Sequence, residues 1–301
     1  MSYLDYAGLT RFKNKSLEDF ASKFSNPNLF INSNFAVNQR GLSSYSGQSI
    51  YTVDRWRLYQ ASGACVVTPR SNGGISVNNS AGTTFSTFRQ YYEDYEKLAG
   101  KTVTVSCHIN SVSGAVRIFF AGAKSETQYS ADLTVGQNSL TITCDSTTTQ
   151  MQIGFNLPAG ASIDVSYMKL EIGSVATAYT PPIIAEELPK CKRYFQKIQS
   201  IGTGNSIGLG FLRSSTQART QIPLSTPMRT TPTITAYTIQ IFNANTNATI
   251  SYDSGTTLFS TNDNFVFVQM AHSTSLGTMG DIIFANGQTA NSYLTLDAEI
   301  Y

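Results

Sequence analysis

Charged residues are scarce in this chain of 301 residues, of which 13% are Asp, Glu, Lys or Arg, whereas typical globular domains carry about 25%. The net charge is only +2, and no cluster of Lys and Arg forms a basic stripe that could follow a phosphate backbone. No apolar run reaches the roughly 18 residues that a membrane-spanning helix needs. We therefore expect neither nucleic acid as a partner nor insertion into a membrane.

Cysteine is also rare, and its spacing excludes two kinds of site. None of the four cysteines forms a Cys-x-x-Cys pair, so neither a zinc site nor a framework of structural disulfides is expected. We expect buried thiols, as in a protein that folds in a reducing cytoplasm. The four cysteines are Cys65, Cys107, Cys144 and Cys191.

Histidine is scarcer still, with only His108 and His272 to serve as a catalytic base. The spacing Gly204-x-Ser206-x-Gly208 matches a nucleophile elbow, but a strand-like run follows it where that motif needs a helix. The sequence therefore predicts no catalytic residues.

Short strand-like runs make up most of the chain. In Thr102–Ile109, Val103, Val105 and Cys107 alternate with Thr and Ser, which is the period-two pattern of a strand with one apolar face. Eight or more such runs, separated by turn residues, predict a jelly-roll β-sandwich over residues 28–182. Similar runs with Asn-, Ser- and Thr-rich loops predict a second β-sandwich within residues 183–301. The expected class is all-β, with two sandwiches joined by a short helix.

Two helical segments accompany the strands. Residues 1–27 carry apolar side chains at three- and four-residue steps, which predicts an amino-terminal helix for attachment or oligomerisation. Residues 183–198 predict the joining helix, along which Leu188, Cys191 and Phe195 form one apolar stripe. This stripe either packs on its own domain or forms an interface between three copies of the chain, and the two interpretations are compatible.

Aromatic residues are plentiful, with 16 Tyr and 17 Phe. Flat aromatic rings can stack on the apolar faces of sugars, while a few polar groups fix the hydroxyls. We expect the single tryptophan, Trp56, in the core, and its neighbours Arg55 and Arg57 on the opposite side if the segment is extended. We predict glycan contacts at Tyr59, Tyr91, Tyr95, Tyr237, Tyr252, Phe259 and His272.

Several stretches carry a recognisable pattern: NLFINSNFAVNQRG at 28–41 followed by YTVDRW at 51–56, YEKLAGKTVTVS at 95–106, and KLEIGSVATAY at 169–179. They resemble the carbohydrate-binding-module-like jelly roll of bacteriophage tail fibre proteins. The hinge EELxxCxRYF at 186–195 and AGLTRF at 7–12 are similar to segments of the same proteins. The resemblance covers roughly residues 1–198, and its motifs are structural rather than catalytic.

The resemblance implies a non-catalytic, homotrimeric receptor-binding protein of the virion tail, made in the bacterial host cytoplasm. Residues 183–301 would form a distal tip that binds a host cell-surface polysaccharide, and residues 1–27 would bind a phage tail or baseplate protein. No cofactor is required. Carbohydrate-binding jelly rolls often carry a structural calcium ion, for which oxygen ligands are suited, and the candidate ligands are Asn34, Asp164 and Glu171.

Two alternatives stay open. One is a structural baseplate adaptor, in which the second β domain binds protein rather than sugar. The other is a surface-polysaccharide hydrolase or deacetylase, because Glu93, Asp94 and Glu96 supply the kind of carboxylates that glycosidases use in pairs.

Overall fold

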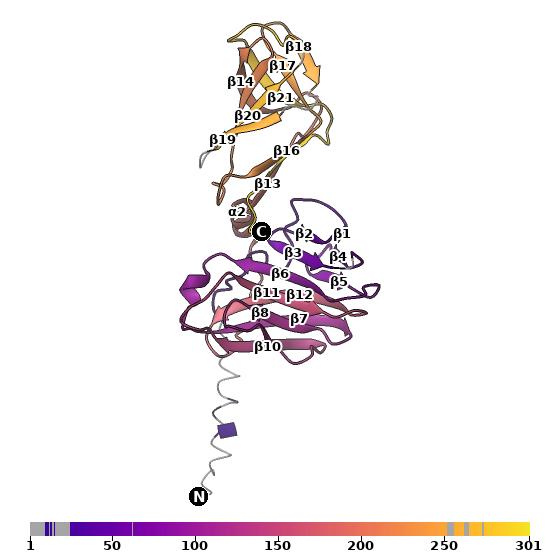
Figure 1. Cartoon of the computed structure of the whole chain (residues 1–301), viewed down its shortest axis with the longest axis vertical. Helices are drawn as coiled ribbons and strands as arrows, with labels where there is room; N and C mark the ends of the chain where they lie inside the picture. The colour runs from indigo at the N-terminus through magenta and orange to yellow at the C-terminus, as the bar shows by residue number, and fades with distance from the viewer. Residues whose placement is uncertain are drawn as a thin grey trace, which may run out of the picture. The chain divides into compact units, whose positions relative to one another are not determined.

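The computed structural model describes residues 25–61, 63–251, 256–261, 265–272 and 274–301, together with positions 10, 11, 13 and 15. This part of the chain is almost entirely β structure (Figure 1), which confirms the predicted all-β class. The chain divides into two compact units, residues 1–187 and 188–301. The predicted amino-terminal helix lies mostly outside the described residues. Among the described helices, none has both the length and the apolar character to cross a membrane.

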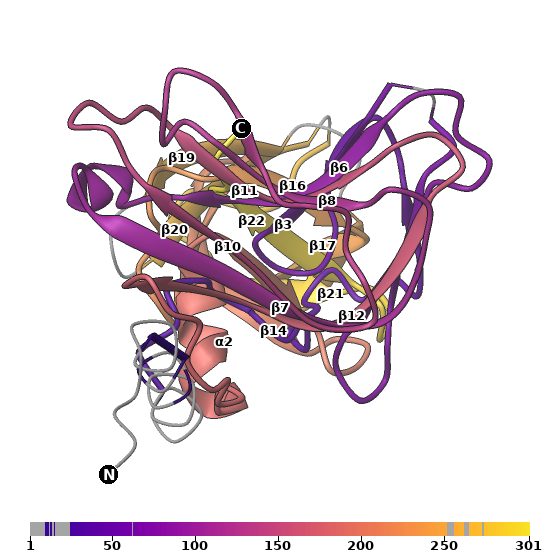
Figure 2. The same cartoon turned by 90° about the horizontal axis from the view of Figure 1, so that it is seen from below.

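Unit 1, residues 1–187, is a β-sandwich of two six-stranded antiparallel sheets. Figure 2 shows β7, β10 and β12 along one side of it and β6, β8 and β11 along the other. Sheet A has the order β1 (Tyr45–Ser46), β4 (Val66–Pro69), β5 (Ile75–Asn78), β12 (Ser162–Ile172), β7 (Thr102–Ser113) and β10 (Gly136–Thr143). Sheet B has the order β2 (Ser49–Tyr51), β3 (Trp56–Gln60), β6 (Ser86–Tyr92), β11 (Met151–Leu157), β8 (Arg117–Ala121) and β9 (Gln128–Tyr129). A 3-10 helix, η1 (Tyr95–Leu98), follows β6.

The core of unit 1 is built around Trp56, as predicted. Its side chain is fully buried, and its ring stacks on Phe88 with 5.2 Å between ring centroids. The indole N–H donates to the carbonyl oxygen of Asn32 at 2.9 Å. The Asn32 side-chain amide in turn donates to the carbonyl oxygens of Val37 and Asp54, at 2.8 and 2.9 Å. These hydrogen bonds of Asn32 hold the stretch 28–41 against one edge of the core of unit 1.

The outer face of sheet A is covered by the segment that follows β12. Thr104, on the outer face of β7, is fully buried and donates to the Gly173 carbonyl oxygen at 2.8 Å. The ring of Tyr179 stacks on Tyr167 of β12, with 3.7 Å between ring centroids. Residues 173–179 thus lie on sheet A, so both faces of its central strands β7 and β12 are in contact with protein.

Unit 2, residues 188–301, contains two further antiparallel sheets, and the division from unit 1 falls within helix α2 (Ile184–Lys192). Its core includes Leu212, Val268, Ile283 and Leu296, all fully buried. The smaller sheet has the order β13 (Phe195–Gln199), β22 (Tyr293–Asp297) and β16 (Thr233–Tyr237). The larger has the order β18 (Ala248–Ser251), β17 (Ile239–Asn243), β21 (Ile282–Gly287), β14 (Ser206–Ser214), β15 (Gln217–Pro223), β20 (Phe265–Ala271) and β19 (Thr256–Thr261).

The joining helix is shorter than the sequence predicts. It ends at Lys192, and the amide of Tyr194 donates to the Cys191 carbonyl oxygen at 2.9 Å. Phe195 begins β13, where it lies opposite Asp297 of β22. The prediction that Phe195 continues the helical stripe is therefore wrong, because pairing with a distant strand overrides the local helical spacing. Cys191 and Phe195 are buried within the chain, and Leu188 is half-buried.

Candidate ligand-binding site

The outward side chains of sheet B form the most distinctive surface of unit 1. Successive strand residues point to opposite faces, and Trp56, Leu58 and Phe88 point into the core. Arg57 and Arg89 lie between these core positions and therefore point outward. None of the six strands of sheet B contains Asp or Glu, so the strands supply positive but no negative charge to this face.

The strand register aligns these outward residues in a row across the sheet. Arg57 lies opposite Tyr51 of β2 on one side and Arg89 of β6 on the other. Arg89 lies opposite Gly154 of β11, which lies opposite Phe119 of β8. A Cβ atom at Gly154 would collide with the backbone of β6, so glycine lets the two strands approach closely beside Arg89. The row therefore has aromatic residues at its ends and two arginines and a glycine between them.

Guanidinium groups and tyrosine rings pack together on this face. The Arg57 Cζ atom lies 5.8 Å from the ring centroid of Tyr51 and 5.6 Å from that of Tyr91. The Arg89 Cζ atom lies 5.0 Å from the centroid of Tyr59 and 5.4 Å from that of Tyr91. All four distances are within the range of cation–π contacts. We call these five residues the Arg–Tyr cluster.

The two arginines of the cluster repel each other electrostatically. Like charges directly opposite one another on a sheet face are destabilising, and Arg57 faces Arg89 in this way. Burial lowers the pKa of Arg89; Tyr91 acts to raise that pKa, and the charge of Arg57 acts to lower it.

Polar groups that suit a hydroxylated ligand lie beside the cluster. Thr87 is 5% exposed, and its hydroxyl oxygen has no hydrogen-bond partner among the described residues. It lies opposite Tyr59 on β3 and opposite Asn156 on β11. Leaving a buried hydroxyl unsatisfied costs about 1–3 kcal/mol. A ligand hydroxyl at this position would remove that cost.

Two of the predicted glycan contacts belong to the cluster, and a third does not. Tyr59 is 37% exposed and lies beside Phe85, with 6.4 Å between ring centroids, whereas Tyr91 is 4% exposed. Tyr95 lies in η1 and packs against the core of unit 1.

Sequence reasoning placed Arg55 and Arg57 on the outward face. This is wrong for Arg55, because the chain turns just before β3: Arg55 has a φ of 71°, is 1% exposed and donates from Nη2 to the Tyr91 carbonyl oxygen at 2.8 Å. Sequence reasoning did not select Arg57 or Arg89 as a ligand residue. The signal was present in the alternation of core residues with Arg and Tyr along β3 and β6.

The predicted contacts in unit 2 do not form a described site. Tyr237 lies in β16 and Phe259 in β19, but their side chains are outside the described part of the structure, as is the whole of Tyr252. His272 follows β20 and is half-buried. Its Nδ1 atom accepts a hydrogen bond from the Thr274 amide at 3.1 Å, which is a local turn contact.

The three candidate calcium ligands are not brought together. Asp164 and Glu171 are seven positions apart on β12, which corresponds to about 23 Å along a strand. Calcium ligands lie about 2.3–2.6 Å from the ion, so these two carboxylates cannot share one. Asp164 instead forms an ion pair with Arg70, and Asn34 lies in the loop between Asn28 and β1. In the described ranges, no group of three or more His, Cys, Asp and Glu residues is placed to hold a metal.

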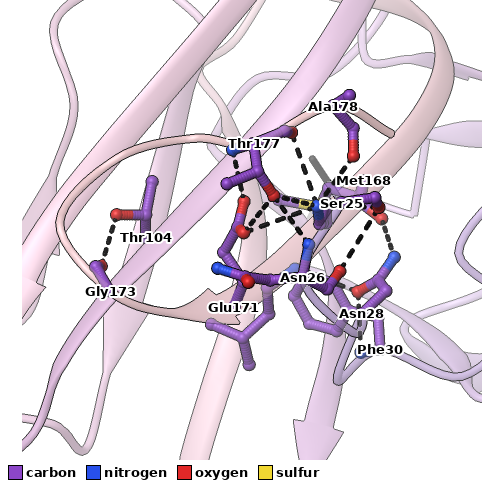
Figure 3. Close-up of polar contacts among 12 residues, drawn as sticks. Ser25, Asn26, Asn28, Phe30, Thr104, Met168, Glu171, Gly173, Thr177 and Ala178 are labelled. Carbon is purple, nitrogen blue, oxygen red and sulfur yellow. Dashed lines mark hydrogen bonds and ion pairs between the residues drawn. The ribbon is translucent and has the colours of Figure 1, made fainter. Parts of the chain in front are cut away.

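Glu171 belongs to a buried network that joins three segments of unit 1 (Figure 3). Its Oε2 atom lies 3.4 Å from Nζ of Lys169, and both side chains are almost completely buried. Thr177 donates to Glu171 from its amide at 2.9 Å and from its hydroxyl at 2.5 Å. The Thr177 hydroxyl oxygen also accepts from the Asn26 amide at 3.0 Å, and Lys169 donates to the Ala178 carbonyl oxygen at 2.9 Å. This ion pair holds the incoming chain at 26 and the outgoing chain at 177–178 against β12.

Unit 2 carries an exposed surface of a different kind. Leu209, Phe211 and Ile282 are 55%, 48% and 52% exposed, and with Phe267 they line a depression of about 350 Å³ on the larger sheet. We call these four residues the apolar face. Contiguous exposed apolar residues mark interaction sites more often than chance. Sequence reasoning did not identify these residues as a surface, although Leu209 and Phe211 alternate with glycines in the sequence.

Comparison with known proteins adds little to this geometry. No protein-family model and no curated protein matches the chain. Among solved structures, the chain is similar to the CBM22-1 xylan-binding domain of Paenibacillus barcinonensis Xyn10C, with 8% identity over 52% of this chain and 98% of that one and a TM-score of 0.30. It is also similar to the CBM22-1-CBM22-2 tandem domain of the same protein, with 10% identity over 91% of this chain and 97% of that one, again with a TM-score of 0.30. At such identities and TM-scores, the likeness says nothing about what this chain binds.

Proposed function

We propose that the protein is a non-catalytic adhesion protein that binds a glycan at the Arg–Tyr cluster of unit 1. The observation that carries this proposal is the cluster itself, in which two guanidinium groups pack against three tyrosine rings on one sheet face. Flat aromatic and guanidinium surfaces suit the apolar faces of sugar rings, and Thr87 and Asn156 supply neighbouring polar atoms for hydroxyls.

The biological setting we propose is the tail of a bacteriophage virion, with a host cell-surface polysaccharide as the receptor. Support comes from the resemblance to tail fibre proteins carried by residues 28–41, 51–56, 95–106 and 169–179. In this setting, residues 1–27 would attach the protein to a tail or baseplate protein. Recognition would rest with unit 1, whereas the resemblance implies a receptor-binding tip at residues 183–301.

Self-association as a homotrimer is a further part of the proposal, and the apolar face of unit 2 is the surface we assign to it. Cys191 and Phe195, two of the three residues expected at an interface between copies, are buried within the chain. Phe211 is 48% exposed beside an apolar depression, so a side chain from another copy could fill that depression. Three linked copies would raise weak glycan affinity through effective concentration.

One of the acidic residues that motivated the catalytic alternative, Asp94, is engaged elsewhere. It precedes η1 and forms an exposed ion pair with Lys97 at 3.0 Å. Release of reducing ends or acetate from host polysaccharide would nevertheless reinstate this alternative, and it should be measured alongside binding.

Binding of the full-length protein to host cells, before and after periodate oxidation of the cells, tests the proposal. We expect periodate to abolish binding, and Tyr59→Ala to weaken binding about 10-fold, because it removes an exposed ring of the cluster. Tyr301→Ala is a matched control, because Tyr301 is an exposed tyrosine, 67% accessible, near the carboxyl terminus. Binding that survives periodate would indicate a protein receptor and favour the adaptor alternative.

A further inference from the structure

We propose that the Arg–Tyr cluster is one end of a longer site, and that the ligand is a linear segment of polysaccharide that lies across the strands of sheet B and reaches Tyr129 on β9. This inference rests on the proposed glycan-binding function and narrows its ligand from a sugar to a chain of several sugars. A single sugar bound at the cluster would contact only the half of sheet B that carries the cluster.

The outward residues of sheet B align across all of its strands. The cross-strand row that contains Arg57 and Arg89 reaches Phe119 on β8. Phe119 in turn lies opposite Tyr129 on the edge strand β9. Residues that lie opposite one another in a sheet point to the same face, so Tyr129 shares its face with the Arg–Tyr cluster. A ligand that follows this row would run across the strands, from the cluster to the edge of the sheet.

Exposed tyrosine rings lie on both sides of this face. Tyr59 on β3 is 37% exposed and Tyr129 on β9 is 49% exposed, whereas Phe119 beside Tyr129 is 4% exposed. The sheet order β3, β6, β11, β8, β9 places four steps between the strands of the two tyrosines, which corresponds to about 19 Å across the sheet at roughly 4.8 Å a step. One sugar ring is smaller than this separation, but a chain of several sugars can stack on both tyrosines.

Polar side chains lie between the two exposed rings. Strand β11 is midway between β3 and β9, and its outward side chains include the amides of Gln152 and Asn156 on either side of Gly154. Both amide side chains are half-buried, so part of each can contact a ligand. An amide carries both hydrogen-bond donors and an acceptor, which suits the hydroxyls of sugars that lie between the rings. The face therefore offers apolar contacts at two places and polar contacts between them, as an extended glycan requires.

The test uses fragments of the polysaccharide purified from the host cells that bind the protein. Partial acid hydrolysis and size fractionation give a series from disaccharides to long fragments, and the full-length protein is titrated calorimetrically with each fraction. We expect the affinity to rise with length to at least about 10-fold above that of the disaccharide, and to stop rising once a fragment spans sheet B. The titration also gives the number of protein chains bound to each fragment, which should stay constant while the affinity rises.

Variants connect the length dependence to Tyr129. Tyr129→Ala should reduce the ratio of long-fragment to disaccharide affinity to about 2-fold, whereas Tyr129→Phe retains the ring and should keep most of that ratio. Tyr59→Ala, at the other end of the site, should weaken binding of every fraction by a similar factor. Tyr301→Ala removes an exposed tyrosine outside sheet B and should change neither the affinities nor their ratio. Tyr129 lies on a two-residue edge strand, so its replacement should leave unit 1 folded, which the fluorescence of Trp56 checks.

The outcomes separate this inference from the proposed function. Equal affinity for short and long fragments would overturn the extended site and leave glycan binding in place, as would a length dependence that is unchanged in Tyr129→Ala. A gain in affinity that appears only when more chains bind to each fragment would also overturn it, because the gain would then come from several copies rather than from sheet B. If no fragment binds while host cells still bind in a periodate-sensitive manner, the extended site fails and the proposed function stands. Binding to host cells that survives periodate would overturn both.

Discussion

Strands β3 and β14 both alternate buried and outward residues, but they present opposite chemistry to solvent. On β3, Arg57 and Tyr59 point outward beside Arg89 of β6. On β14, Leu209 and Phe211 point outward beside Ile282 of β21. The two surfaces, the Arg–Tyr cluster and the apolar face, therefore share antiparallel geometry and differ in side-chain type.

The difference between these surfaces indicates what each would bind. A surface of guanidinium groups and tyrosine rings suits a ligand that has both polar groups and apolar faces, such as a soluble or cell-attached glycan. An exposed apolar surface gains most of its free energy by excluding water against another apolar surface. We therefore assign ligand recognition to unit 1 and self-association to unit 2, and the following variants test that assignment in order of expected effect.

The largest effect should follow loss of the buried cation in unit 1. Lys169→Met leaves Glu171 charged and buried without its partner, so unit 1 should lose about 3–5 kcal/mol of unfolding free energy. Trp56, the only tryptophan, lies in the core of unit 1, so its fluorescence during urea unfolding reports on that unit alone. Circular dichroism reports on both units. A matching shift in the unfolding of unit 2 would contradict the separation into two cores.

The double variant Lys169→Met with Glu171→Leu serves as the control for this prediction. Replacing both members of a buried ion pair with apolar residues often costs little, so the double variant should be more stable than the single one. The opposite result would show that the hydrogen bonds of Glu171 to Thr177 outweigh the ion pair.

The second largest loss of stability should follow substitution of a glycine in each of the two sheets that carry these surfaces. A Cβ atom would collide with the Phe88 carbonyl oxygen at Gly154 and with the Arg219 carbonyl oxygen at Gly210. Each Gly→Ala change should cost about 1–3 kcal/mol, because tightly packed backbone must shift. Gly154→Ala should lower the midpoint of the tryptophan transition, whereas Gly210→Ala should lower only the midpoint of unit 2. Gly202→Ala is a control, because its backbone does not have a positive φ and an added Cβ there meets only the movable end of the Asn205 side chain, at 2.9 Å.

A third and smaller effect concerns association. Replacing both Leu209 and Phe211 with Ser should weaken self-association at least 10-fold, which corresponds to about 1.4 kcal/mol, since both side chains are exposed on the apolar face. Sedimentation velocity at micromolar concentration should show a smaller mass than that of the unmodified protein. Arg57→Gln, on the other surface, should leave the mass unchanged. An unaltered mass in the double Ser variant would remove the apolar face as the interface.

The smallest effect is expected at an exposed ion pair on sheet B. Arg117 and Asp132 are separated by 2.6 Å, but their side chains are 48% and 53% exposed. Arg117→Gln should therefore change the unfolding free energy of unit 1 by less than about 1 kcal/mol. Tryptophan-detected urea unfolding measures this directly, and a loss comparable to that in Lys169→Met would contradict the distinction between exposed and buried pairs.

Local pattern was sufficient to predict much of the fold. The alternation of Val103, Val105 and Cys107 correctly identified buried positions on β7, and Trp56 was correctly placed in the core. The same local reasoning failed at Phe195, where a helical spacing continued past Lys192 and the chain instead paired with β22. Helical periodicity is a short-range signal, and a partner strand far along the sequence can override it.

The candidate site was less predictable because it depends on register between distant strands. Alternation shows that Arg57 and Arg89 each point away from a core, but not that they lie opposite each other. Placing Gly154 beside Arg89 requires the pairing of β6 with β11, which no local pattern specifies. A search for Arg and Tyr at outward positions of neighbouring strands would have narrowed the candidates, since cation–π partners must share a face.

The buried network around Lys169 also determines how mechanical tension would pass through unit 1. The amide of Asn26 donates directly to Thr177, and Lys169 donates to Ala178, so the points where the chain enters and leaves the sandwich are linked (Figure 3). A pull on the chain before Asn26 is therefore transferred within a few bonds to the segment that leads into α2.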